Sequence, residues 1–142
     1  MTRPRFARTI TVLALLGMAI SAVSVKNHYS TEDTGYCSFG ESFDCDLVNR
    51  SIYSKLFGIP VAGIGLIGYA LLLVLAWLRH RPLRWLLFAA ATAGLAFSLY
   101  LTYLEAYVLV VWCILCIISL VLISLITLFA AAGLGRRSAS SA

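Results

Sequence analysis

Cys113 and Cys116 stand in C-x-x-C spacing inside an almost unbroken apolar run. If the run is helical, residues three apart lie on one face, so the two sulfur atoms can meet and close a disulfide. A dithiol that opens and closes is a two-electron redox centre. A buried cysteine can also serve as a small hydrophobic residue with no chemical task. The second pair in the chain, Cys37 and Cys45, favours the redox interpretation.

The composition is that of a membrane protein. Of the 142 residues, 61% are hydrophobic and 12% are charged, whereas a soluble domain is about half apolar and about a quarter charged. The net charge of +5 forms no basic stripe, so we do not expect nucleic-acid binding. Four thiolates could hold zinc, but the Cys37-x7-Cys45 spacing is too wide and a metal site in hydrocarbon is costly. We therefore expect no metal.

Four apolar segments are long enough to cross a membrane. We expect transmembrane helices at residues 7–26, 58–78, 83–105 and 107–132, followed by a tail at 133–142. The first segment follows three arginines and could be a signal peptide, but it is longer than a typical signal core and has only a weak cleavage pattern. Glu105 is expected simply to end the third helix. The predicted fold class is an all-α membrane protein, a four-helix transmembrane bundle forming one domain over 1–142.

The one long hydrophilic segment, residues 27–57, is an outer loop that contains Cys37, Cys45 and an acidic patch. Within it, residues 46–55 have the apolar spacing of a short amphipathic helix, which would lie at the membrane interface. Pro60 suits the first turn of the second span, where a missing N–H costs little.

The charges predict the orientation of the four spans. With four spans, both termini and the turn at 79–84 share one side, and the loop and Glu105 share the other. The first side carries eight arginines, and the second carries three basic residues and all six acids. Because basic residues are in excess on the cytoplasmic side, we expect both termini in the cytoplasm and both cysteine pairs toward the outside. Cys113 and Cys116 would then lie roughly 9–14 Å inside the outer end of the last helix.

Two dithiols at different depths predict relayed thiol–disulfide exchange. The shallow pair can meet a protein thiol, and the deep pair can meet a lipid-soluble oxidant.

The chain resembles the vitamin K epoxide reductase (VKOR) family in its bacterial, disulfide-generating form, over about residues 7–132. The resemblance rests on these residues together: Cys37-x7-Cys45, Cys45-Asp46-x4-Ser51, Phe57-Gly58-Ile59-Pro60, Ser98-Leu99-Tyr100-Leu101 and Cys113-x2-Cys116. It implies a four-helix bundle around a quinone, either ubiquinone or menaquinone, which accepts the electrons. The outer loop and its short interfacial helix would cap the quinone pocket. It also implies a multi-pass protein of the bacterial inner membrane, which we expect to be monomeric.

The resemblance also implies roles for the cysteines. Cys37 and Cys45 would be the shuttle pair and Cys113 and Cys116 the active-site pair, with Cys116 facing the quinone. Electrons would enter at Cys37 from a reduced thioredoxin-like (DsbA-type) partner and pass through a transient Cys45–Cys113 disulfide. We expect that partner to be a separate protein, because the chain carries no fused thioredoxin-like domain.

Other residues take roles by their position in the family pattern. Ser51 occupies the position of a serine near the loop cysteines, although a cap or turn hydroxyl is an equal interpretation. Phe57, Val61 and Leu109 are predicted to line the quinone pocket.

The chain departs from the animal enzymes, which carry an asparagine ahead of the second span and a tyrosine four residues after the last cysteine. Here the loop is short, no asparagine lies between Asn49 and Phe57, and position 120 is Leu120. Plain quinone reduction is therefore expected rather than epoxide reduction. Two alternatives stay open: a quinone or vitamin K epoxide reductase driven by small thiols, and a structural membrane protein whose cysteines form static disulfides.

Overall fold

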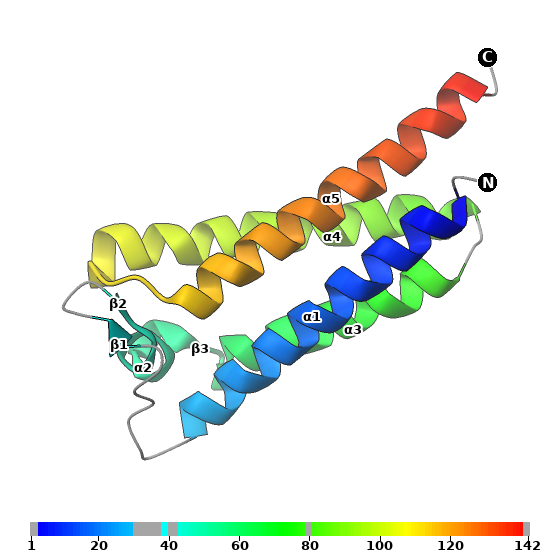
Figure 1. Ribbon diagram of the computed structural model, residues 1–142. Helices are drawn as coiled ribbons and strands as arrows, with labels where there is room; N and C mark the ends of the chain where they lie inside the picture. The colour runs from blue at the N-terminus through cyan, green and yellow to red at the C-terminus, as the bar shows by residue number, and fades with distance from the viewer. Residues whose placement is uncertain (1–2, 30–37, 40–42, 79–80, 141–142) are drawn as a thin grey trace.

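The computed structural model describes residues 3–29, 38–39, 43–78 and 81–140. Four long helices account for most of it: α1 (Arg3–Tyr29), α3 (Val61–Trp77), α4 (Arg81–Leu104) and α5 (Ile114–Ser140). Helix α1 packs on α3 and α5, and α4 packs on the same two helices, so the four form a closed ring. The predicted all-α, four-helix bundle is confirmed (Figure 1).

Three of these helices contain apolar stretches long enough to cross a membrane, at Arg5–Tyr29, Pro82–Leu109 and Ile114–Gly135. The fourth, α3, has 17 residues, or about 26 Å at 1.5 Å per residue, which is at the short end of what a bilayer accepts. Large apolar side chains such as Leu15, Leu71 and Leu128 point outward. An apolar exterior of this kind suits lipid rather than water.

Small elements gather at one end of the bundle, opposite the chain ends (Figure 1). They are β1 (Ser38–Phe39), β2 (Phe43–Asp44), α2 (Cys45–Arg50), the 3₁₀-helix η1 (Ile52–Ser54), β3 (Lys55–Leu56), β4 (Ile59–Pro60) and the π-helix η2 (Glu105–Leu109). Strands β1 and β2 pair antiparallel, as do β3 and β4. The short helix expected over 46–55 is therefore divided into α2, η1 and the start of a hairpin.

The turn between β3 and β4 consists of Phe57 and Gly58. Both have positive φ angles, 53° and 81°, as required at the two central residues of a type I′ hairpin turn. This conformation directs the Phe57 side chain away from the bundle, where it is 96% exposed. The hairpin leads directly into α3 through Pro60.

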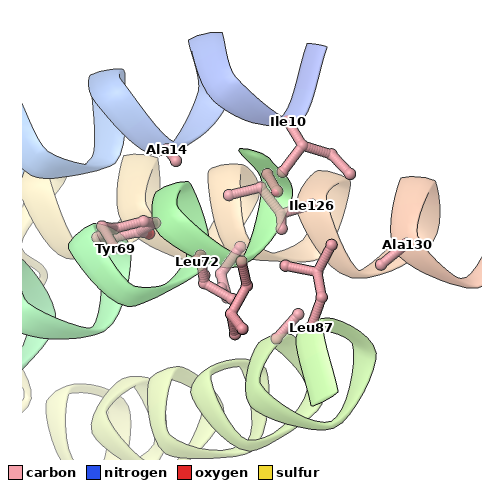
Figure 2. Close-up of a cluster of buried hydrophobic side chains, with 11 residues drawn as sticks. Ile10, Ala14, Tyr69, Leu72, Leu87, Ile126 and Ala130 are labelled. Carbon is pink, nitrogen blue, oxygen red and sulfur yellow. The ribbon is translucent and has the colours of Figure 1, made fainter. Parts of the chain in front are cut away.

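The core is built from one stripe on each helix (Figure 2). Along α1 the buried residues recur every three or four positions, which is the spacing of one helical face. They are Ile10, Ala14, Gly17, Ser21, Ser24 and Asn27. Figure 2 shows Ile10 and Ala14 of α1, Tyr69 and Leu72 of α3, Leu87 of α4, and Ile126 and Ala130 of α5 around a common centre. Because most of the α1 stripe is small, α3 can approach it closely.

The C-terminal end of α5 also differs from expectation. Residues 133–140 continue α5 to Ser140 instead of forming a separate tail. Gly133 and Gly135 do not end the helix, because the same hydrogen-bonded ladder runs through them.

Replacement of Gly17 by alanine should destabilise the bundle. A Cβ atom at this position would overlap the aromatic ring of Tyr69, and overpacking of this kind costs about 1–3 kcal/mol. Gly63→Ala is the matched control, since a Cβ there meets no atom within 4 Å. We expect thermal unfolding in detergent to show a loss of stability for Gly17→Ala and none for Gly63→Ala. Equal stability of the two variants would contradict the packing of α1 on α3.

Replacement of Asp44 by alanine should loosen the start of α2. The Asp44 side chain caps this helix by accepting a hydrogen bond from the Leu47 N–H at 3.0 Å, and loss of such a cap costs about 1 kcal/mol. Amide hydrogen exchange at Leu47 should become about fivefold faster in Asp44→Ala. Asp44→Asn retains the acceptor and should exchange like the wild type; unchanged exchange in the alanine variant would show that the cap is unimportant.

Candidate active site

The connection between α4 and α5 does not follow the sequence prediction. A fourth span beginning at residue 107 was expected, but residues 105–109 form the π-helix η2 and α5 begins only at Ile114. Val110 ends η2 in the left-handed conformation, with φ 54° and ψ 30°, which is unusual for a β-branched residue. The prediction was wrong because this stretch is apolar throughout, and hydropathy alone cannot reveal a break in the backbone.

This break changes where the C-x-x-C pair lies. Cys113 precedes α5 and its carbonyl accepts the Ile117 N–H at 3.0 Å, while Cys116 lies in the first helical turn. The pair is thus at the start of the helix. The sequence had predicted a position about two turns inside it, and that prediction was wrong. Cys113 is fully buried and Cys116 is half-buried. Both are free thiols and lie close enough to interact.

A buried carboxyl group adjoins both thiols. Glu105, the first residue of η2, is 2% exposed, and its Oε2 accepts a hydrogen bond from the Cys113 N–H at 3.1 Å. The carboxyl group also interacts with the Cys116 side chain. Its Oε1 has no hydrogen-bond partner among the residues that the structure describes. Glu105 is therefore part of the site.

Sequence reasoning treated Glu105 only as the end of a helix. A signal for its role was present, since an ionisable residue within an apolar span is expensive and marks a functional site by default. Glu105 is the one acidic residue in the sequence after the hydrophilic segment 27–57, called the polar loop below.

A cavity of about 350 Å³ extends from this point into the bundle, within the range of small-molecule sites. All four long helices and α2 contribute to its mostly apolar wall. Cys116 and Glu105 lie on the wall, and so do Val61 and Leu109, two of the three residues predicted to line a quinone pocket. The third, Phe57, is exposed on its hairpin turn and lies apart from the wall. Its assignment to the pocket was wrong, because the positive φ angle turns the side chain outward.

Tyr69 is a second wall residue that sequence reasoning missed. Its hydroxyl group donates to the Ser119 carbonyl at 3.0 Å and lies 2.8 Å from the Ser119 Oγ. These contacts connect α3 to the turn of α5 that follows Cys116. Among the polar groups on this largely apolar wall are one pair at Glu105 and Cys116 and another at Tyr69 and Ser119.

The polar loop reaches the active-site cysteines through its backbone. Phe43 forms a parallel β-bridge with Trp112, and the Asp44 N–H donates to the Trp112 carbonyl at 3.2 Å. Cys45 directly follows Asp44, and Cys113 directly follows Trp112. Cys45 and Cys113 are therefore the next residues in the chain after Asp44 and Trp112, which are hydrogen-bonded to each other. Cys37 lies outside the described residues, and only the backbone of Cys45 is described.

Helix α2 also packs over the active-site pair. Val48 of α2 joins Ile20 and Val23 of α1 against the buried Cys113 and Leu115. Through this apolar cluster, α1 and α2 pack against the start of α5. Cys113 is fully buried within this cluster.

Ser51 has the contact expected of a turn hydroxyl. Its Oγ donates to the Val48 carbonyl at 2.9 Å, at the end of α2. The residue also lies on the cavity wall. Both interpretations of Ser51, as a structural cap and as a supporting group of the site, are compatible with this position.

Comparison with known protein families gives a match over residues 8–131 to the vitamin K epoxide reductase family. The matched region extends from α1 to α5 and contains the cavity, the polar loop and both cysteine pairs. Members of this family are helical membrane oxidoreductases that act on quinones. The chain belongs to the vitamin K epoxide reductase family and is a membrane oxidoreductase.

Proposed function

We propose that this protein reduces a membrane quinone and passes oxidising equivalents through two cysteine pairs to a thioredoxin-like (DsbA-type) partner. It would thereby support disulfide formation in exported proteins. Cys113 and Cys116 are the active-site pair in this proposal, and Cys37 and Cys45 are the shuttle pair. The quinone is ubiquinone or menaquinone, drawn from the membrane pool.

The observation that carries the proposal is the hydrogen bond from the Asp44 N–H to the Trp112 carbonyl. It joins the residue before Cys45 to the residue before Cys113, although 68 positions separate Asp44 from Trp112 in the sequence. Neighbouring strands lie about 5 Å apart. The bridge pairs Phe43 with Trp112, so the backbone at Asp44 and Cys45 passes close to the backbone at Trp112 and Cys113. A disulfide needs Cα atoms about 4.4–6.8 Å apart, and this proximity supports exchange between Cys45 and Cys113.

The cavity fits a quinone as electron acceptor. Its wall is largely apolar, as a lipid-soluble ring requires, and its few polar groups are the kind that orient a bound ligand. Cys116 lies on that wall in the first turn of α5, so its sulfur atom adjoins the space that the quinone would occupy. When bound, the quinone would supply a two-electron sink beside this sulfur.

The relay balances electrons and bonds at each step. Oxidation of the active-site dithiol forms the Cys113–Cys116 bond, and two electrons and two protons pass to the quinone. The Cys45 thiolate then attacks the Cys113 Sγ, which forms a Cys45–Cys113 bond and releases the Cys116 thiolate. The Cys37 thiolate attacks Cys45 in turn, so Cys113 is released and the shuttle disulfide forms. Exchange with the dithiol of the partner restores the reduced shuttle pair.

The orientation in the membrane follows from charge. Arg5 and Arg8 of α1 and Arg84 of α4 lie at the end of the bundle that holds the chain ends, and the polar loop lies at the other end (Figure 1). The excess of basic residues at the first end supports a cytoplasmic location for it. We infer an inner-membrane protein of bacteria whose loop and cysteines face the extracytoplasmic side.

Replacement of Cys116 by serine should abolish quinone reduction. Purified protein in detergent, with a quinone and a reduced thioredoxin-like protein, should consume quinone in an absorbance assay; Cys116→Ser should be at least about 100-fold slower, because a hydroxyl cannot replace the thiolate. Ser124→Ala is the control, since Ser124 lies on the same helix and its Oγ donates to the Leu120 carbonyl one turn earlier. Turnover by Cys116→Ser at the wild-type rate would contradict the proposal.

Removal of one cysteine should trap the relay. In Cys37→Ala the mixed disulfide cannot be resolved, so a Cys45–Cys113 bond should accumulate. In Cys116→Ala the same bond should form when Cys113 attacks an oxidised shuttle pair. Proteolysis without reducing agent, followed by mass spectrometry, detects the cross-linked peptides. The Cys37→Ala, Cys45→Ser double variant is the negative control, and absence of the link from both single variants would overturn the order of the relay.

A further inference from the structure

We propose that Glu105 is the proton carrier of the site, moving thiol protons from Cys116 and Cys113 to the quinone. This inference rests on the proposed quinone reduction and adds the group that completes it. It concerns a residue outside both cysteine pairs, in the π-helix η2 that follows α4.

The first argument is the cost of burying Glu105. Its side chain is 2% exposed, and Oε1 has no partner in the described part of the chain. A buried carboxyl group with an unused oxygen is unfavourable, and such groups in native structures call for an explanation. The Cys113 N–H explains only the position of Oε2. The remaining oxygen is available to exchange a proton.

The second argument is the position of Glu105 relative to the reacting atoms. It lies on the wall of the same cavity as Cys116, and its carboxyl group interacts with the side chains of both active-site cysteines. Among the side chains that the structure describes, these two thiols, at and just before the start of α5, are the titratable groups that interact with it. His28 of α1 and Tyr69 of α3 line the cavity elsewhere. Glu105 is therefore placed between the source of the protons and the space for their acceptor.

The third argument is the backbone that holds the residue. The Glu105 carbonyl accepts the N–H groups of Val110 and Val111, the latter at 3.2 Å, and so closes η2. A π-turn is rare and is often found at functional sites, and Val110 adopts a strained left-handed conformation beside it. If α4 simply continued as an α-helix, its backbone would be less strained. The Glu105 side chain would then not lie against the start of α5.

The proton balance identifies the task. Conversion of two thiols to a disulfide releases two protons, and reduction of a quinone to the quinol consumes two. In a cavity with an apolar wall, a fixed carboxylate can take the Cys116 proton and leave the thiolate, which is the electron donor. The proton then passes to one quinone oxygen. The same carboxylate takes the Cys113 proton to the second oxygen and ends unprotonated, as it began.

Close negative charges couple these transfers. A carboxylate and a thiolate in contact cannot both remain charged at low dielectric, so the pair tends to hold one proton between them. Loss of the proton by Cys116 and its arrival on Glu105 are thus one event. This coupling lets the thiolate form without the release of a proton to water, because the carboxylate accepts it.

Glu105→Gln and Glu105→Asp test the inference in a single turnover of the pre-reduced Cys113–Cys116 pair with quinone. Glutamine retains an oxygen that can accept the Cys113 N–H but carries no exchangeable acid proton, so the rate should fall by about 100-fold or more. The variant rate should also rise about tenfold per pH unit, because solvent must then generate the thiolate. Aspartate keeps the acid and should recover part of the rate with the shallow pH dependence of the wild type.

The outcomes separate the two proposals. If the wild type reduces quinone and Glu105→Gln does so at the same rate and with the same pH profile, Glu105 only positions Cys113 and the inference is overturned while the proposed function stands. If the wild-type dithiol fails to reduce any quinone, both proposals fail. Should Glu105→Gln not fold, time-resolved infrared spectroscopy of the wild type decides: a transient protonated-carboxyl band during quinone reduction supports the inference, and its absence overturns it.

Discussion

Satisfaction of backbone polar groups in an apolar environment is the constraint on which the site depends. A membrane helix meets this requirement internally, and non-helical backbone at such depth persists only where other protein groups satisfy it. Between α4 and α5 the ladder breaks, and Glu105 supplies the partners: its carbonyl accepts the Val111 N–H and its side chain accepts the Cys113 N–H. One acidic residue thereby stabilises a break that an apolar sequence would otherwise not form.

The break positions the chemistry. Because α5 begins at Ile114, Cys113 caps the helix and Cys116 lies in its first turn, on the cavity wall. The free carbonyl of Trp112 then accepts the Asp44 N–H, so the polar loop is held against the same point. An uninterrupted helix would use that carbonyl in its own ladder. The loop contact, the depth of the cysteines and the burial of Glu105 are therefore consequences of one change in backbone conformation.

The features predicted correctly from sequence are those that depend on composition over many residues. Four apolar segments with polar connections predict four helices, and the structure has them. The features missed depend on single backbone conformations. The left-handed Val110 leaves no mark in hydropathy, and the outward turn of Phe57 follows from a φ angle that its family position does not reveal. Glu105 was visible as an isolated acid, but its contact with Cys113 depends on the break that hydropathy cannot predict.

The same distinction applies to the polar groups of the cavity. Comparison along the sequence assigned the polarity beyond Cys116 to position 120, where Leu120 replaces a tyrosine. In the structure, Leu120 packs against the hydrophobic core cluster, and the hydroxyl group on this part of the wall belongs to Tyr69 of α3, held by Ser119. Tyr69 fits there because Gly17 of α1 leaves room for its ring. The polarity of the cavity is thus a property of three packed helices, and a single position in the last helix does not determine it.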